Sequence, residues 1–170
     1  HGGVTGTAPR TVPPPPPPPP EGPAGPILVV ASSVNPFSRY YAEILRAEGF
    51  SAFTAMDGSS VTAATLAGRE VVILGEFALT DAQAAMFGDW VSAGGNLVAM
   101  RPDPKLAPLL GLTPTGGTLS NGYLLVSAAA PPGQGIVAET MQFHGAADLY
   151  TASGGTATVA TLYSSAVTAT

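Results

Sequence analysis

The stretch REVVILGEFALTDAQAAMFGDWVSAGGNLVAM, residues 69–100, decides the fold of this 170-residue chain. Its run Val71–Leu74 is short, apolar and rich in β-branched residues, which is typical of a strand buried on both faces. Thr80 and Gln83 have the spacing of a capping box, in which two side chains satisfy free N–H groups at a helix start. Two glycines end that helix, and Asn96–Met100 is expected to be the next buried strand. The stretch therefore predicts a strand–helix–strand unit.

Two helices are expected to turn an apolar stripe toward the core. In the helix after Thr80, the stripe is formed by residues at four-residue spacing, which are Ala82, Met86 and Trp90. An earlier helix begins at Asn35-Pro36, where proline suits the first helical position, and Gly49 ends it. Its inward face is predicted to hold the four residues Tyr40, Tyr41, Ile44 and Leu45.

The remaining elements complete an alternating pattern. Strands are expected at Ile27–Ala31 and Phe50–Met56, with a short helix or turn at Ser60–Leu66 before the central unit. Strands that alternate with helices through short connections predict an α/β fold, a wound parallel sheet with helices on both faces. After Met100 the pattern changes, and a brief helix is expected at residues 105–110. Extended runs are expected at residues 123–126, 136–143 and 156–163.

The chain divides into an arm and a domain. Residues 1–25 form a Gly/Thr/Pro-rich arm or linker, in which Pro13–Pro20 is an uninterrupted octaproline. Because proline fixes φ and has no N–H, this segment is expected to be a polyproline II rod about 25 Å long. Residues 26–170 form the α/β domain. No terminating signal follows Ser164, so a domain cut before its last strands is one expectation.

Composition excludes several function classes. The net charge is −5, with one lysine and five scattered arginines. Nucleic-acid binding needs clustered basic residues, so no nucleic-acid partner is predicted. No apolar run approaches the roughly 20 residues that span a bilayer, so no membrane span is predicted. The chain has no cysteine, which excludes disulfides, thiolate metal sites and cysteine nucleophiles.

The same composition favours an extracellular protein. Only 10% of residues are charged, against about 25% in a typical domain, so Thr, Ser, Gly and Ala must form much of the surface. This suits a secreted protein or one covered by neighbours. The chain starts at His1, which a removed signal peptide would explain.

The order of elements resembles a known family, the class I glutamine amidotransferase-like domains of flavodoxin-like topology. The similarity is to the non-catalytic versions in large secreted bacterial proteins. It rests on segments that span nearly everything after residue 26, which are 27–33, 70–76, 79–83, 90–100, 106–111 and 143–150. The resemblance implies a flavodoxin-like wound sheet.

Catalytic members of that family use a cysteine on a sharp turn after a sheet strand, with a histidine and a glutamate further on. In this chain the strand exits read Leu74-Gly75-Glu76 and Ala99-Met100-Arg101-Pro102, without a thiol. A G-x-S-x-G elbow, which would provide a serine nucleophile, is absent as well. The sequence therefore predicts a protein that is not an enzyme.

A candidate ligand rim follows the carboxyl ends of the predicted strands, where α/β sheets bind their ligands. Its residues are Ser32, Ser33, Asp57, Glu76, Arg101 and Asp103. The three carboxylates could hold Mg²⁺ or Ca²⁺. The alternative is that they are solvated loop residues, partly paired with Arg101 and Lys105. No glycine-rich phosphate loop follows Ser32-Ser33, and no cofactor is predicted.

Two histidines are candidates for metal binding. His1 is an N-terminal histidine followed by glycine, a start that resembles a copper brace, and His144 would have to supply the second imidazole. His144 could also act as an acid–base group, with Asp148 four residues later. A hydrogen-bonded structural role for His144 is the simpler expectation.

The sequence leads to one main functional hypothesis and one alternative. The main one is a non-enzymatic extracellular structural or assembly module. Its proline-rich arm would bind identical subunits, in a homo-oligomer or a filament, or neighbouring modules of a larger secreted protein. The alternative is a carbohydrate-binding or carbohydrate-active module that uses the strand-end rim.

Overall fold

The computed structural model describes residues 25–129 and 131–166. The predicted polyproline rod at Pro13–Pro20 and the candidate metal ligand His1 lie outside the described residues. Within residues 25–129 and 131–166, no helix is both long and apolar enough to cross a lipid bilayer.

A parallel sheet of four strands forms the first part of the structure. Its strands are β1 (Ile27–Ala31), β2 (Phe53–Asp57), β3 (Val71–Leu74) and β4 (Asn96–Ala99), in the order β2-β1-β3-β4. All neighbouring pairs are parallel. This is the order of the flavodoxin-like wound fold, so the predicted fold class is confirmed.

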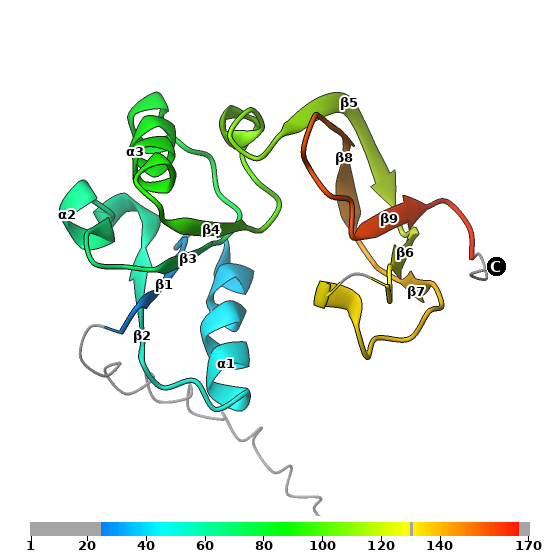
Figure 1. Cartoon of the computed structure of the whole chain (residues 1–170), viewed down its shortest axis with the longest axis horizontal. Helices are drawn as coiled ribbons and strands as arrows, with labels where there is room; N and C mark the ends of the chain where they lie inside the picture. The colour runs from blue at the N-terminus through cyan, green and yellow to red at the C-terminus, as the bar shows by residue number, and fades with distance from the viewer. Residues whose placement is uncertain (1–24, 130, 167–170) are drawn as a thin grey trace, which may run out of the picture.

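Helices cover both faces of this sheet, as Figure 1 shows. On one face, α1 (Tyr40–Ala47) packs its buried Ala42 against Val29 and Phe53. On the other face, α2 (Ala63–Leu66) and α3 (Asp81–Ser92) enclose the larger core cluster. The fully buried members of that cluster include Leu28, Val30, Leu66, Val72, Phe87 and Leu106.

The predicted inward stripes of the helices were partly wrong. Tyr40 and Ile44 of α1 are 52% and 56% exposed, and the small residue Ala42 lies against the sheet instead. In α3, Ala82 is exposed, whereas Phe87 is 1% exposed. Large apolar side chains matched the helical period on more than one face, so the period alone did not identify the face that packs on the sheet.

The prediction that residues 96–100 form a fully buried strand was also wrong. β4 pairs with β3, and within the described ranges no strand pairs with its other side. Val98 is 44% exposed as a result. The apolar sequence of β4 resembles that of a central strand, although β4 lies at the edge.

Short elements connect the strands. A 3-10 turn, η1 (Pro36–Arg39), leads into α1, and η2 (Gly58–Ser60) leads from β2 toward α2. The capping box between Thr80 and Gln83 is present at the start of α3, as predicted. β2 starts at Phe53, three residues after the expected Phe50, which is 53% exposed.

After β4 the chain forms antiparallel sheets. The turn η3 (Pro104–Leu106) is followed by β5 (Leu112–Ser120), which pairs with β8 (Ala146–Ala152). Next to them, β6 (Tyr123–Val126) pairs with β7 (Met141–Gln142) and β9 (Ala160–Tyr163), and η4 (Pro131–Gly133) precedes β7. The predicted strand at 123–126 is confirmed, whereas β5 and β8 were not expected. Figure 1 shows these sheets beside the wound sheet.

Candidate functional site at the carboxyl edge of the sheet

The carboxyl edge of the wound sheet contains a hollow at its topological switch point. β1 and β3 are neighbours, but the helices that follow them lie on opposite faces, which opens a crevice between their ends. The hollow has a volume of about 470 Å³. Its lining comes from the segments after β1, β3 and β4 and from β8, and it includes Asn35, Glu76, Phe77, Arg101, Asp103 and Asp148.

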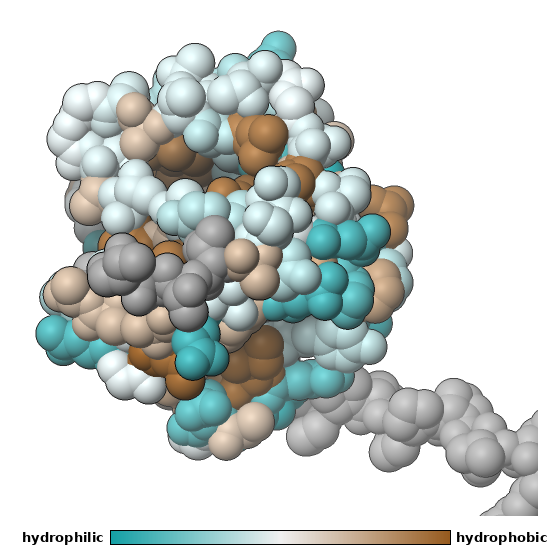
Figure 2. Space-filling view, turned by 90° about the vertical axis from the view of Figure 1, so that its right-hand side faces the viewer, coloured by the Kyte–Doolittle hydropathy of each residue, from teal (hydrophilic) through white to brown (hydrophobic). Residues whose placement is uncertain are grey.

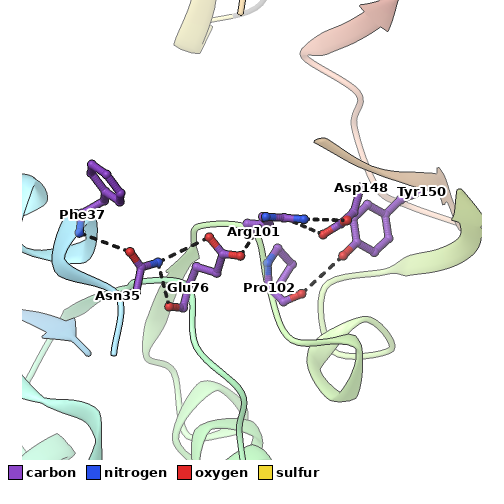
Figure 3. Close-up of polar contacts among 7 residues, drawn as sticks. All are labelled: Asn35, Phe37, Glu76, Arg101, Pro102, Asp148 and Tyr150. Atoms are coloured by element: carbon purple, nitrogen blue, oxygen red, sulfur yellow. Dashed lines mark hydrogen bonds and ion pairs between the residues drawn. The ribbon is translucent and has the colours of Figure 1, made fainter. Parts of the chain in front are cut away.

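Arg101 forms the centre of the site, as Figure 3 shows. Its Nη1 lies 2.9 Å from Oε1 of Glu76, which follows β3. Its Nε and Nη2 donate to the two carboxylate oxygens of Asp148 on β8, at 2.9 and 3.1 Å. A guanidinium that binds a carboxylate through two parallel hydrogen bonds is fixed in orientation as well as in distance. The arginine therefore joins the wound sheet to the antiparallel part.

Arg101 also has an unusual backbone. Its φ is 45°, one of two positive values at non-glycine residues in the described part of the chain. For a residue with a Cβ this region costs about 1–2 kcal/mol. The preceding Met100 is still held to the sheet, since its N–H donates to the carbonyl of Leu74 at 2.8 Å. The chain thus turns sharply at the exit of β4, and the turn directs the Arg101 side chain between two carboxylates.

Asn35 positions Glu76 from the opposite side. Its Oδ1 accepts from the N–H of Phe37 and caps η1. Its Nδ2 donates to the backbone carbonyl of Glu76 at 3.2 Å and to the Glu76 carboxylate at 3.4 Å. The sequence identified Asn35 as a helix start, but gave no indication of this contact across 41 residues.

Asp103 lies in the same hollow, but its carboxylate accepts hydrogen bonds from the backbone. Its carboxylate accepts from the N–H of Leu79 and from the N–H of Lys105, both at 2.9 Å. Burial opposes ionisation of Asp103, but these two hydrogen bonds and the Lys105 charge outweigh it, so the pKa of Asp103 is lowered. The carboxylate fastens the start of α3 to η3.

Ser32, Ser33 and Asp57 form a second group, at the ends of β1 and β2. Asp57 accepts from the Oγ and N–H of Ser59, at 2.6 and 2.9 Å, and from the N–H of Ser33 at 2.8 Å. These hydrogen bonds, that of the Ser59 hydroxyl first, lower the pKa of Asp57 to about 2. Ser32 is buried, and its N–H donates to Oγ of Ser38. The predicted rim is therefore two clusters, with only Glu76, Arg101 and Asp103 in the hollow.

The ion pairs set the charge states of the hollow. The hydrogen bond from Arg101 lowers the pKa of Asp148, and Asp148 in turn raises the pKa of Arg101. Burial raises the pKa of Tyr150, and the charge of Asp148 adds to this effect. The Tyr150 hydroxyl donates to the carbonyl of Pro102 at 3.3 Å. The site at neutral pH is thus a cation held between two carboxylates.

The arrangement favours paired loop residues over a cation site. In the described ranges, no group of three or more His, Asp or Glu side chains is placed to hold a metal ion. The Glu76 carboxylate forms an ion pair with Arg101. The Asp103 carboxylate accepts from backbone N–H groups and lies 3.9 Å from Nζ of Lys105. His144 is exposed in the segment before β8, and Asp148, its expected neighbour, binds Arg101 instead.

Asp148 and Tyr150 are the site residues that sequence reasoning missed. Both lie on β8, a strand that was not predicted. Nothing local distinguishes their carboxylate and hydroxyl from those of surface residues, because their partners are 47 and 48 residues away. Only knowledge of the pairing between β5 and β8 would have placed them at the rim.

Comparison with known proteins finds a similar solved structure. No family model matches the chain, and no curated protein matches it. The structure resembles the crystal structure of a protein described as "a putative gmp synthase subunit a protein" from Thermoplasma acidophilum. The TM-score is 0.58 at 13% identity, and the match covers 83% of this chain and 74% of the other. This similarity supports the glutamine amidotransferase-like fold that the sequence resemblance implies.

Proposed function

We propose that this chain is a non-enzymatic extracellular structural or assembly module, whose proline-rich arm binds identical subunits or neighbouring modules. The observation that carries this proposal is the engagement of the hollow's charged groups with one another. Glu76, Arg101 and Asp148 form a continuous set of ion pairs between two parts of the chain. A catalytic site would need at least one of these groups to be directed at a substrate instead.

The exit of β4 supports the same proposal. The resemblance implies a cysteine on a sharp turn after a sheet strand in catalytic members. The sharp turn after β4 carries Arg101, and the chain has no cysteine. A guanidinium is always protonated in proteins and cannot act as a nucleophile. The turn that could present a nucleophile therefore carries Arg101, whose guanidinium is paired with Glu76 and Asp148.

The surface is consistent with coverage by neighbours. Figure 2 views the molecule from the side of the antiparallel sheets and shows mostly pale residues of intermediate hydropathy, with small hydrophobic and hydrophilic areas. Between β6 and β8, the large apolar side chains of Ile136, Val137 and Met141 are 39–61% exposed. Low charge and scattered apolar residues suit a surface that meets other protein.

Removal of the arm tests the proposal. Both core clusters consist of residues from Ile27 onward, so a chain that begins at Gly25 keeps the complete core. We expect light scattering to show assemblies of the full chain and monomers of the shortened chain. The circular dichroism spectra of the full and shortened chains should differ only by the signal of the arm, because the domain stays folded. An unchanged assembly size after removal of residues 1–24 would contradict the proposal.

Carbohydrate binding is the second candidate function, and the hollow favours it. Its volume of about 470 Å³ and its amide, carboxylate and guanidinium groups would suit a polar ligand. Calorimetric titration with oligosaccharides should show binding that Glu76→Ala weakens. The control is Glu70→Ala, which removes an exposed carboxylate at the opposite edge of the sheet. Absence of heat for every oligosaccharide would exclude this candidate.

A further inference from the structure

An apolar groove is lined by residues of α2, Ala67 and residues of α3. Figure 1 shows that these two helices lie on the face of the wound sheet opposite α1. The volume of the groove is about 420 Å³. Leu66 and Ala67 form one wall, and Met86, Asp89 and Trp90 of α3 form the other. Asp89 is the one charged group in the lining, and Trp90 is the single tryptophan of the chain. Grooves with an aromatic wall are typical receptors for proline-rich segments.

The chain's own arm has the matching chemistry. Residues 13–20 are eight consecutive prolines, and proline-rich segments favour the extended polyproline II form before binding, so such a segment loses little conformational entropy when it binds. The groove extends along α3 from Ala82 to Trp90, which is about 12 Å at 1.5 Å per residue. At about 3.1 Å per residue, four or so prolines fill that length.

Charge complementarity gives the arm a direction in the groove. Arg10 is the only charged side chain among residues 1–20 at neutral pH, and it precedes Pro13, the first residue of the octaproline, by three positions. Asp89 is exposed beside Trp90, and no other described residue forms an ion pair or side-chain hydrogen bond with it. With Pro13 against Trp90, Arg10 lies about 9 Å further along the extended chain, within reach of Asp89.

The same direction favours the arm of a second copy. Gly25, where the described chain begins, accepts a hydrogen bond from Arg69, and a hollow next to the groove includes both Arg69 and Trp90. The arm therefore joins its own domain at the Trp90 end. With Pro13 at that end, Pro20 lies about 22 Å away. The five steps from Pro20 back to Gly25 span at most about 18 Å, which restricts how an arm can reach the groove of its own domain, whereas the arm of a second copy has no such restriction.

We propose that the groove between α2 and α3 binds the Arg10–Pro20 segment of a second copy of this chain. Arg10 pairs with Asp89, and the prolines pack on Trp90 and Met86. This inference rests on the proposed assembly function and assigns the surface that receives the arm. Each copy offers one arm and one groove, so the contact is head-to-tail and produces rings or filaments.

Trp90 provides a direct reporter of this contact, because it is the only indole. The full chain is diluted from high to low concentration while tryptophan emission and light scattering are recorded together. We expect the emission maximum to move to shorter wavelength as the average mass rises, since the prolines exclude water from the indole. Asp89→Lys and Arg10→Glu should each raise the midpoint concentration of both signals at least tenfold.

Glu48→Lys is the matched control, because it makes the same charge change at an exposed position that follows α1 on the opposite face. It should leave both midpoints unchanged. Mixing the Arg10→Glu chain with the Asp89→Lys chain supplies the decisive comparison. In an alternating assembly every arm then meets a groove of opposite charge, so the mixture should recover assembly that neither variant shows alone.

The outcomes separate this inference from the function on which it rests. Assembly with no change in Trp90 emission, or equal effects of Asp89→Lys and Glu48→Lys, would place the arm's receptor elsewhere and leave the assembly function standing. An emission shift that does not depend on concentration would mean that each arm binds its own domain, which contradicts the second copy. A chain that stays monomeric at every concentration would overturn both.

Discussion

The guanidinium of Arg101 binds the carboxylate of Asp148 through two hydrogen bonds, of 2.9 and 3.1 Å, across 47 residues of sequence. The pair connects the exit of β4 to the middle of β8. A hydrogen bond from Tyr150 to the carbonyl of Pro102 lies next to it. The junction between the parallel and antiparallel parts is therefore polar and has a defined geometry.

Asp148→Asn should loosen this junction more than it lowers global stability. Both side chains are partly exposed, at 42% for Arg101 and 32% for Asp148, so solvent screens the pair. We expect the free energy of unfolding to fall by about 1 kcal/mol or less in urea titrations. Amide hydrogen exchange in β5 and β8 should accelerate.

Lys105→Gln is the control for this variant, because its Nζ lies 3.9 Å from both Asp81 and Asp103 and contributes little. Equal effects of Asp148→Asn and Lys105→Gln on exchange in β8 would show that the two-bond geometry has no special importance.

The pH dependence of stability should reflect Asp57. Its pKa is lowered from 3.8 to about 2 in the folded protein. A carboxyl with a lowered folded-state pKa stabilises the fold above its unfolded pKa, and this stabilisation disappears as the pH falls from about 4 to 2. Asp57→Asn should therefore flatten the loss of stability over this range. Urea midpoints at pH 5 and pH 2.5 test this, and an identical loss in both proteins would contradict it.

Phe87 should be the most costly residue of α3 to truncate. It is 1% exposed and belongs to the larger core cluster, so Phe87→Ala leaves a cavity under the helix. We expect a loss of about 3–5 kcal/mol in the free energy of unfolding. Ile44→Ala on α1 is the control, since Ile44 is 56% exposed and should change stability by less than about 0.5 kcal/mol. Similar losses for both would mean that the assigned faces are wrong.

Gly88 and Gly95 should respond in opposite ways to alanine. Gly88 lies inside α3 with open space where a Cβ would be, so Gly88→Ala should stabilise the protein by about 0.5–1 kcal/mol. A Cβ at Gly95 would lie 2.3 Å from the Trp90 ring, so Gly95→Ala should displace the indole and destabilise by about 1–3 kcal/mol. Thermal unfolding with tryptophan emission measures both, and stabilisation by Gly95→Ala would contradict the packing of Trp90.

Signals confined to a few neighbouring residues made the wound sheet predictable. Val71–Leu74 and Ile27–Ala31 are short β-branched runs, and Thr80 with Gln83 caps a helix whether or not the rest of the fold is known. These elements appear where the sequence placed them. The position of β4 at the edge was not predictable, because an apolar strand does not reveal how many neighbours it has.

In the antiparallel part, the pairing of β5 with β8 escaped prediction for a different reason. β5 contains Pro114, Gly116 and Gly117, residues that favour turns, and the structure accommodates them with a shift of register between Pro114 and Thr118. Only part of the charged site could be predicted from the sequence. Glu76 and Arg101 follow strands and could be located by counting, whereas Asp148 reaches the site through the pairing of β8 with β5.

The order of the strands also determines when each part can form during synthesis. Every pairing of the parallel sheet joins residues between Ile27 and Ala99, so all four strands exist before β5 begins at Leu112. Domains generally fold from the N-terminus as the ribosome releases them. On a chain that is still growing, Arg101 therefore waits for a further 47 residues before Asp148 is made, with Glu76 as its ion-pair partner in the meantime.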